Sequence, residues 1–184
     1  MNEKRALLIE TALDLFYQKG INSVGINEVL KTSAVAKKTL YHHFSGKEEL
    51  VLAALQRRND IFLQWLDEQL STAENDRELV EVLFHALSRW LNDQVAELAI
   101  FRGCFFINTV AEYPDGTSTI VQYCVEHKQR VRAMIAARLQ NDNPNLLDLI
   151  CLLKEGAIVS AQTCQDKQAA EKSLAVVIQS GYLD

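Results

Sequence analysis

The stretch of residues 26–50 constrains the fold of this chain more than any other segment. Its pattern predicts a short helix over residues 26–33, a tight turn, a second short helix over about 37–43, and a longer helix that begins after Ser45. Two short helices joined in this way form a helix-turn-helix unit, whose second helix enters the major groove of DNA. We therefore expect a nucleic-acid-binding unit near the N-terminus.

The remainder of the chain predicts further helices and no sheet. Only seven glycines and two prolines occur among 184 residues, so few breakers interrupt the helical spacing of apolar residues. The clearest turns are residues 113–116 and 141–144, each of which contains a proline. The expected fold class is all-α with nine helices, over residues 3–19, 26–33, 37–43, 47–70, 75–90, 97–112, 118–140, 145–164 and 167–181.

A capping signal marks the predicted boundary between two domains. Ser45 and Glu48 fit the S-x-x-E capping box, in which the two residues satisfy free backbone donors reciprocally. Asn75 and Glu78 give a second such signal at the start of a later helix. We therefore predict an N-terminal helix-turn-helix domain of residues 1–46, and a helical domain of residues 47–184 joined to it by a long helix.

Composition and motifs exclude several classes of protein. No apolar run reaches about 18 residues, so we expect no membrane span and a cytoplasmic location. The four cysteines are widely spaced, without a Cys-x-x-Cys pair, so neither a metal site nor a cofactor is predicted. The sequence lacks the G-x-S-x-G, H-E-x-x-H, P-loop and G-x-G-x-x-G motifs, and we therefore expect no enzyme activity.

The net charge of −5 opposes DNA binding at first sight, but it is unevenly distributed. Residues 1–50 carry seven Lys or Arg against six Asp or Glu, whereas residues 51–184 carry twelve against eighteen. Contact with phosphate depends on the local field rather than on the total charge. The N-terminal part therefore remains compatible with DNA, although its basic excess is small.

Residues around the second short helix have the chemistry of DNA contacts. Lysine meets phosphates or guanine acceptors, tyrosine and histidine donate to phosphate oxygens, and threonine touches base edges. Taken singly, each is more often a solvated surface residue, and it is their clustering on one face that favours contact. The adjacent His42 and His43 point in different directions on a helix and lack a third metal ligand. The predicted DNA-binding set is Ile26, Lys37, Lys38, Thr39, Tyr41, His42 and Lys47.

Two consecutive motifs carry a resemblance to a known family. They are Thr-Leu-Tyr-His-His-Phe at residues 39–44 and Ser-Gly-Lys-Glu-Glu-Leu at residues 45–50. Together with the first helix they resemble, over residues 3–52, the tetracycline-repressor (TetR) family of bacterial transcriptional regulators. The resemblance implies a homodimer that binds a palindromic double-stranded DNA operator, and a C-terminal domain that binds a small-molecule effector, releases the operator and forms the dimer.

Some residues depart from the family pattern. Ala34 stands where a glycine is usual, which costs about 1 kcal/mol if its φ is positive. Ala36 removes the usual cap of the second short helix, at a cost of about 1 kcal/mol. Leu30 replaces a smaller alanine, and Lys38 replaces a common glycine. We therefore expect the family fold but leave the docking angle and the operator sequence open.

The C-terminal part offers candidates for an effector pocket. Residues 102–114 resemble a segment of some family members, and Asn108 shares a helix face with Cys104 and Ile107. A single polar group on an apolar wall suits a binding cavity, although a core asparagine bonded to a neighbouring helix explains it equally well. Aromatic residues at helical spacing are likewise often simple core. The candidates are Trp65, Phe84, Trp90, Cys104, Phe105, Asn108, Tyr123 and His127.

Small and bulky residues of the last two helices predict a dimer interface. Small residues allow close helix approach, as in a four-helix bundle formed by two subunits, but they also allow packing within one subunit. The candidates are Leu149, Leu152, Leu153, Gly156, Ala157, Ser160, Val176 and Val177. The short recognition helix also supports a twofold pair, because a single such helix reads few base pairs.

Two alternative functions remain open at this point. The acidic balance and the missing cap favour a TetR-like sensor or interaction protein that has lost DNA binding. The cysteines, Cys104 first among them, allow a thiol-based redox-responsive regulator. The identity of the effector, the operator and the direction of control are not readable from the sequence.

Overall fold

The first three helices form a small three-helix core. The computed structural model describes residues 3–140 and 143–183. Within it α1 (Glu3–Lys19) packs against α2 (Ile26–Ser33) and α3 (Lys37–His43). The apolar side chains between these helices are fully or almost fully buried, among them Leu8, Phe16, Val29, Leu40 and Phe44. Burial of this apolar surface holds the short α2 and α3, which would be marginal as isolated helices.

The turn between α2 and α3 has the strained backbone that the sequence suggested. Ala34 lies in the left-handed region, with φ of 54° and ψ of 22°. Ser33 Oγ accepts a hydrogen bond of 3.3 Å from the Val35 N–H, which satisfies one donor of the turn. Ala36 precedes α3 without a side-chain cap. Both predicted departures from the usual turn are therefore present in the fold.

The start of α4 (Lys47–Leu70) differs in detail from the predicted capping box. The Ser45 N–H donates to Glu49 Oε2 at 2.7 Å, so Glu49 rather than Glu48 reaches back over the helix start. At α5 (Asp76–Leu91) the predicted cap is confirmed, because Asn75 Oδ1 accepts from the Glu78 N–H at 2.9 Å, whereas Glu78 Oε2 reaches back to the Glu74 N–H at 2.9 Å rather than to Asn75.

The helix predicted over residues 97–112 is wrong in its first half. A 3-10 turn, η1 (Ala96–Leu98), is followed by irregular chain, and α6 (Phe105–Glu112) begins only at residue 105. Ala99 and Gly103 have φ of 57° and 86°, which no α-helix accommodates. Asp93 Oδ1 accepts from the Phe101 N–H at 2.6 Å and stabilises the irregular segment.

The last three helices are close to the predicted ones. They are α7 (Thr119–Ala136), α8 (Pro144–Thr163) and α9 (Ala169–Gln179). Asn143 Oδ1 caps α8 by accepting from the Leu146 N–H at 3.0 Å. Asn141 and Asp142, the first half of the predicted turn before α8, lie outside the described residues. Over the part of the chain that the structure describes, nine α-helices and no strand are present, as predicted.

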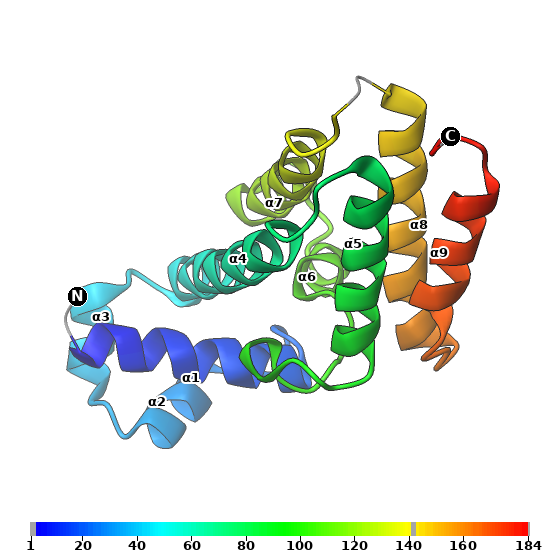
Figure 1. Cartoon of the computed structure of the whole chain (residues 1–184). Helices are drawn as coiled ribbons and strands as arrows, with labels where there is room; N and C mark the ends of the chain where they lie inside the picture. Colours follow the sequence, from blue (N-terminus) through cyan, green and yellow to red (C-terminus); the bar gives the residue numbers. More distant parts are fainter. Residues whose placement is uncertain (1–2, 141–142, 184) are drawn as a thin grey trace. The chain divides into compact units, whose positions relative to one another are not determined.

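The helices pack into two compact units, each built from two segments of the chain (Figure 1). The first unit takes the chain up to residue 60 together with residues 105–127. The second unit takes residues 61–104 together with the chain from residue 128 onward, and in it α9 packs on both α5 and α8. The division into functional domains at residue 46 stays a prediction, because packing units do not report what each part binds. None of the helices in the described residues has the length and apolar character needed to cross a bilayer.

Candidate nucleic-acid interface

One face of α3 presents cations and an aromatic ring to solvent. Leu40 is fully buried, and this fixes which side of the helix faces the core. Lys37, Lys38 and His42 are exposed, and 49% of Tyr41 is exposed. The Lys37 ammonium lies 6.0 Å from the centre of the Tyr41 ring. Together with the half-buried Thr39, these residues form what we call the α3 surface, which brings five of the seven predicted DNA-binding residues together.

The other two predicted DNA-binding residues lie elsewhere in the first unit. Ile26 is half-buried at the first residue of α2. Lys47 begins α4, and its ammonium donates to the Ile21 carbonyl oxygen at 2.6 Å. The Lys47 side chain is therefore engaged within the chain, which its position at a helix start did not reveal.

The local charge around α3 is more favourable for contact with phosphate groups than the net charge of the chain. Residues 29–44 include three lysines and no aspartate or glutamate. The third lysine, Lys31, is exposed near the end of α2 and was absent from the predicted set. The absence of acidic residues from this stretch of the sequence already indicated that Lys31 belongs to the set. Such a local excess of positive charge favours contact with a polyanion despite the total of −5.

Four of the predicted effector residues lie in the first unit. Phe105 is buried and its ring meets Tyr17 edge to face at 6.0 Å. His127 is buried, stacks on Phe106 at 3.5 Å, and has its Nδ1 3.0 Å from the amide oxygen of Asn59. The remaining two, Asn108 and Tyr123, are half-buried on α6 and α7.

The other four predicted effector residues lie in the second unit. Trp90 is almost fully buried, with the rings of Phe62 at 5.5 Å, Phe101 at 5.2 Å and Trp65 at 6.5 Å. Among the described residues the Trp90 Nε1–H finds no hydrogen-bond acceptor, an uncommon state for a buried donor. Phe84 and Cys104 are buried as well.

Two surface depressions in the described part of the chain lie away from the predicted effector residues. One, in the second unit, includes His85 and Arg89, and the other, in the first unit, includes Ser45 and Tyr113. Neither contains any of the eight predicted residues. The effector pocket therefore stays a prediction.

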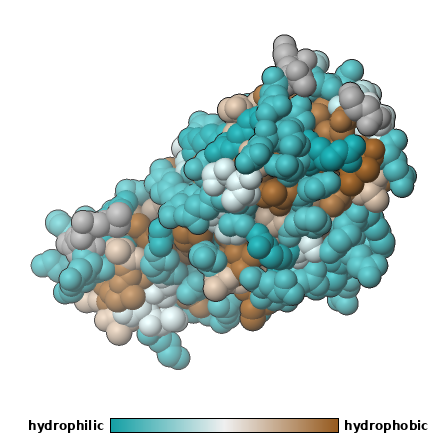
Figure 2. Space-filling view, in the orientation of Figure 1, coloured by the Kyte–Doolittle hydropathy of each residue, from teal (hydrophilic) through white to brown (hydrophobic). Residues whose placement is uncertain are grey.

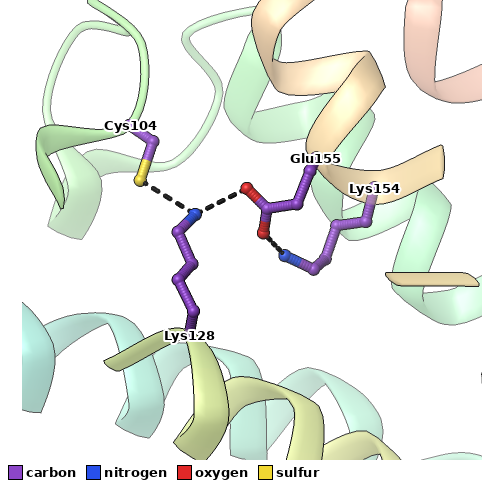
Figure 3. Close-up of polar contacts among 4 residues, drawn as sticks. All are labelled: Cys104, Lys128, Lys154 and Glu155. Carbon is purple, nitrogen blue, oxygen red and sulfur yellow. Dashed lines mark hydrogen bonds and ion pairs between the residues drawn. The ribbon is translucent and has the colours of Figure 1, made fainter. Parts of the chain in front are cut away.

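Cys104 takes part in a polar cluster that the sequence analysis missed (Figure 3). Its sulfur lies 3.4 Å from the Lys128 ammonium, which also contacts Glu155 Oε2 at 2.6 Å. The other Glu155 oxygen accepts from Lys154, a lysine that is only 5% exposed. The signal for Lys154 was its spacing: it follows Leu146 and Ile150 at intervals of four on the buried face of α8.

The charges of this cluster shift the pKa values of its members. Burial alone would raise the pKa of Glu155, but the two neighbouring ammonium groups and their hydrogen bonds outweigh it and lower the pKa to about 2. Burial likewise opposes the charge on Lys128, yet Cys104 and Glu155 raise the pKa of this ammonium. Glu155 thus forms ion pairs with both Lys128 and Lys154.

The predicted dimer residues on α8 and α9 divide by exposure. Leu152 is 72% exposed, and Val176 and Gly156 are also exposed. Three more, Leu149, Leu153 and Ser160, are half-buried, whereas Ala157 and Val177 pack inside their own unit. Figure 2 shows brown, apolar atoms over the upper parts of α8 and α9 as Figure 1 places them. Val159 and Ile178 are further exposed apolar residues of these helices that the prediction omitted.

Comparison of the sequence with known proteins finds one matching family and several related transcriptional regulators. The profile of the family described as bacterial regulatory proteins, TetR family, matches residues 8–54. The transcriptional repressor NemR of Escherichia coli is 28% identical over 145 residues, which cover 78% of this chain and 71% of NemR. The transcriptional activator FasR of Mycolicibacterium smegmatis is 33% identical over 85 residues, but these span only 46% of this chain and 39% of FasR.

The likeness extends to the whole fold in solved structures. A TetR-family transcriptional regulator from Streptomyces coelicolor superposes with a TM-score of 0.83, at 28% identity, over 97% of this chain and 94% of that one. The crystal structure of reduced E. coli NemR superposes with a TM-score of 0.77, at 27% identity, over 95% of both chains. The chain thus contains the N-terminal domain of the TetR family of bacterial regulatory proteins at residues 8–54, and its whole fold is that of TetR-family transcriptional regulators.

Proposed function

We propose that the protein is a DNA-binding transcriptional repressor that acts as a homodimer on a palindromic operator and is released by a small-molecule effector. The observation that carries this proposal is the α3 surface, where cations and a half-exposed tyrosine stand on the second helix of a helix-turn-helix unit. The TetR-family domain and relatives named as transcriptional regulators support it, and they also support a non-enzymatic role. We further propose a cytoplasmic location.

The geometry of α3 explains why a dimer is part of the proposal. The helix has seven residues, about two turns, and reads only a few base pairs. Two copies related by twofold symmetry would read two half-sites and double the number of neutralised phosphates. The exposed apolar residues of α8 and α9 supply the surface on which we expect the two copies to meet.

Two substitutions on the α3 surface test the proposed function. Lys37→Ala and Tyr41→Ala should each weaken binding to the DNA upstream of the protein's own gene by about tenfold or more, because each removes an interaction worth about 1–3 kcal/mol. Lys37→Ala should also reduce the slope of log affinity against log salt by about 0.9 for each phosphate that the lysine neutralises. Fluorescence anisotropy at several salt concentrations measures both quantities.

Lys19→Ala is the matched control. It removes the same charge from the same unit, at an exposed site whose partner is Glu28, and should change affinity less than about twofold. If both α3 variants bind as the unmodified protein does, the recognition surface is wrongly assigned. If the unmodified protein itself binds no DNA, the alternative of a TetR-like sensor without DNA binding stands.

The contact between Cys104 and Lys128 favours a second candidate, a thiol-based redox-responsive regulator. Attack of the sulfur on hydrogen peroxide gives a sulfenic acid and water, and an ammonium at 3.4 Å stabilises the negative charge that the attacking sulfur carries. Peroxide should then weaken DNA binding by the unmodified protein but not by Cys104→Ser. Cys164→Ser, at an exposed cysteine, is the control and should respond normally. A Cys104→Ser protein that loses DNA binding in peroxide would exclude Cys104 as the sensor.

A further inference from the structure

The chain between α1 and α2 is bound by a residue far away in sequence. This α1–α2 loop comprises residues 20–25. The Ile21 N–H donates to Glu112 Oε1 at 2.9 Å, and the Asn22 N–H donates to Glu112 Oε2 at 2.6 Å. The Asn22 side-chain amide also donates to the Glu112 carbonyl oxygen at 3.2 Å. One residue at the end of α6 thus accepts three hydrogen bonds from two consecutive loop residues.

The opposite side of the same loop is held by a cation. The Ile21 carbonyl oxygen accepts from the Lys47 ammonium at 2.6 Å, while the Ile21 side chain is fully buried. Groups of opposite charge on α6 and α4 therefore bind the N–H and the carbonyl of a single residue. Hydrogen bonds to ionised groups are about twice as strong as those between neutral groups.

Glu112 does not serve the helix on which it stands. It is the last residue of α6, where the helix dipole disfavours a negative charge by a few tenths of a kcal/mol or more. Its carboxylate is instead satisfied by the loop. The close approach also depends on Gly20, which has φ of +84° and whose Cβ, if one were present, would lie 3.3 Å from Glu112 Oε1.

We propose that Glu112 is a positioning residue for DNA binding: by fixing the α1–α2 loop it sets the placement of α2 and, through the three-helix core, of the α3 surface. This inference rests on the proposed function.

The test uses the full chain and a fluorescein-labelled duplex from the region upstream of its own gene. Glu112→Gln keeps the shape and one acceptor but places an NH2 group against a backbone N–H, so affinity should fall about tenfold. Glu48→Gln is the control, because it removes the same charge from an exposed position in the same unit. It should leave affinity within about twofold, or raise it slightly through reduced repulsion.

Two further measurements separate positioning from simple stability. Hydrogen exchange at the Ile21 and Asn22 amides should be about tenfold faster or more in Glu112→Gln, with exchange in the α3 core unchanged. Affinities are compared well below the unfolding temperature of each variant, so that only folded protein is measured.

The possible outcomes are distinct. If Glu112→Gln binds as tightly as the unmodified protein, or if Glu48→Gln loses as much affinity, the positioning role is refuted while the proposed function stands. Retained protection of the two amides in Glu112→Gln would refute it too, since the carboxylate would then not hold the loop. If the unmodified protein binds no DNA, both proposals fall together.

Discussion

Ala34 carries a backbone conformation that glycine adopts more readily. Its φ of 54° brings the Cβ atom close to the following carbonyl oxygen, which costs an L-residue about 1–2 kcal/mol. The residue is exposed, so the methyl group gains little from packing in return. The turn of the helix-turn-helix is therefore formed in spite of its sequence, by the burial of Leu40 and Val29 on either side of it.

Ala34→Gly should stabilise the protein. We expect the free energy of unfolding to rise by about 0.5–1 kcal/mol, since relief of the left-handed strain exceeds the greater entropy of glycine in the unfolded chain. Urea unfolding followed by circular dichroism measures the change. Ala6→Gly, within α1, is the control and should lose about 1 kcal/mol. A lower urea midpoint for Ala34→Gly would contradict the strain argument.

For single residues, the sequence predicted which side chains are exposed better than it predicted their hydrogen-bond partners. The α3 surface was predictable because Leu40 alone fixes which side of a short helix is buried. The bond from Lys47 to Ile21 was not, because it joins residues 26 positions apart. Glu49 replaced Glu48 in the capping contact because Gly46, not Ser45, directly precedes α4, which shifts the geometry by one residue.

Helix boundaries were predictable wherever a local signal set them. Asn75 and Asn143 cap α5 and α8 through their own side chains, and both caps lie at turns that the sequence marks. The start of α6 was not predictable, since its cause is tertiary. Gly103 has φ of 86°, which interrupts any helix, and a Cβ there would lie 2.0 Å from Gln162 Oε1 of α8, so packing against α8 leaves room for glycine alone.

The polar cluster of Cys104, Lys128, Lys154 and Glu155 should make the free energy of unfolding depend on pH in the acid range. The pKa of Glu155 is about 2 in the folded protein against 4.5 for the free group. Its contribution to stability is therefore complete above about pH 4.5 and is lost as the pH falls toward 2. A third of the side chain is exposed, so solvent screening reduces the contribution to about 1 kcal/mol.

Urea unfolding at pH 6 and pH 3 tests this dependence. Over this range the unmodified protein should lose more of its free energy of unfolding than Glu155→Gln does, by the larger part of the ~1 kcal/mol that Glu155 contributes. Glu97→Gln, in the exposed part of η1, should behave as the unmodified protein. An identical pH dependence in the unmodified protein and Glu155→Gln would show that the cluster does not hold Glu155 ionised.

For the molecule as a whole, we expect subunit association to depend on the exposed apolar residues of α8 and α9. Leu152→Glu should give a monomer in native mass spectrometry and lose DNA affinity, because a buried unpaired carboxylate costs several kcal/mol in each subunit. Ile100→Glu is the matched control, since Ile100 is 63% exposed in the same unit. A Leu152→Glu protein that remains dimeric would place the interface elsewhere.

The first unit is assembled from two separate stretches of chain, residues up to 60 and residues 105–127. Glu112 in the second stretch completes the hydrogen bonding of Ile21 and Asn22 in the first. If the DNA-binding part were cut out as one contiguous N-terminal piece and fused to the effector-binding domain of another protein, those donors would lack their carboxylate. A hybrid regulator that takes its DNA-binding part from this protein therefore needs both stretches. Exchange of that part between related regulators requires two separate segments of the gene to be replaced.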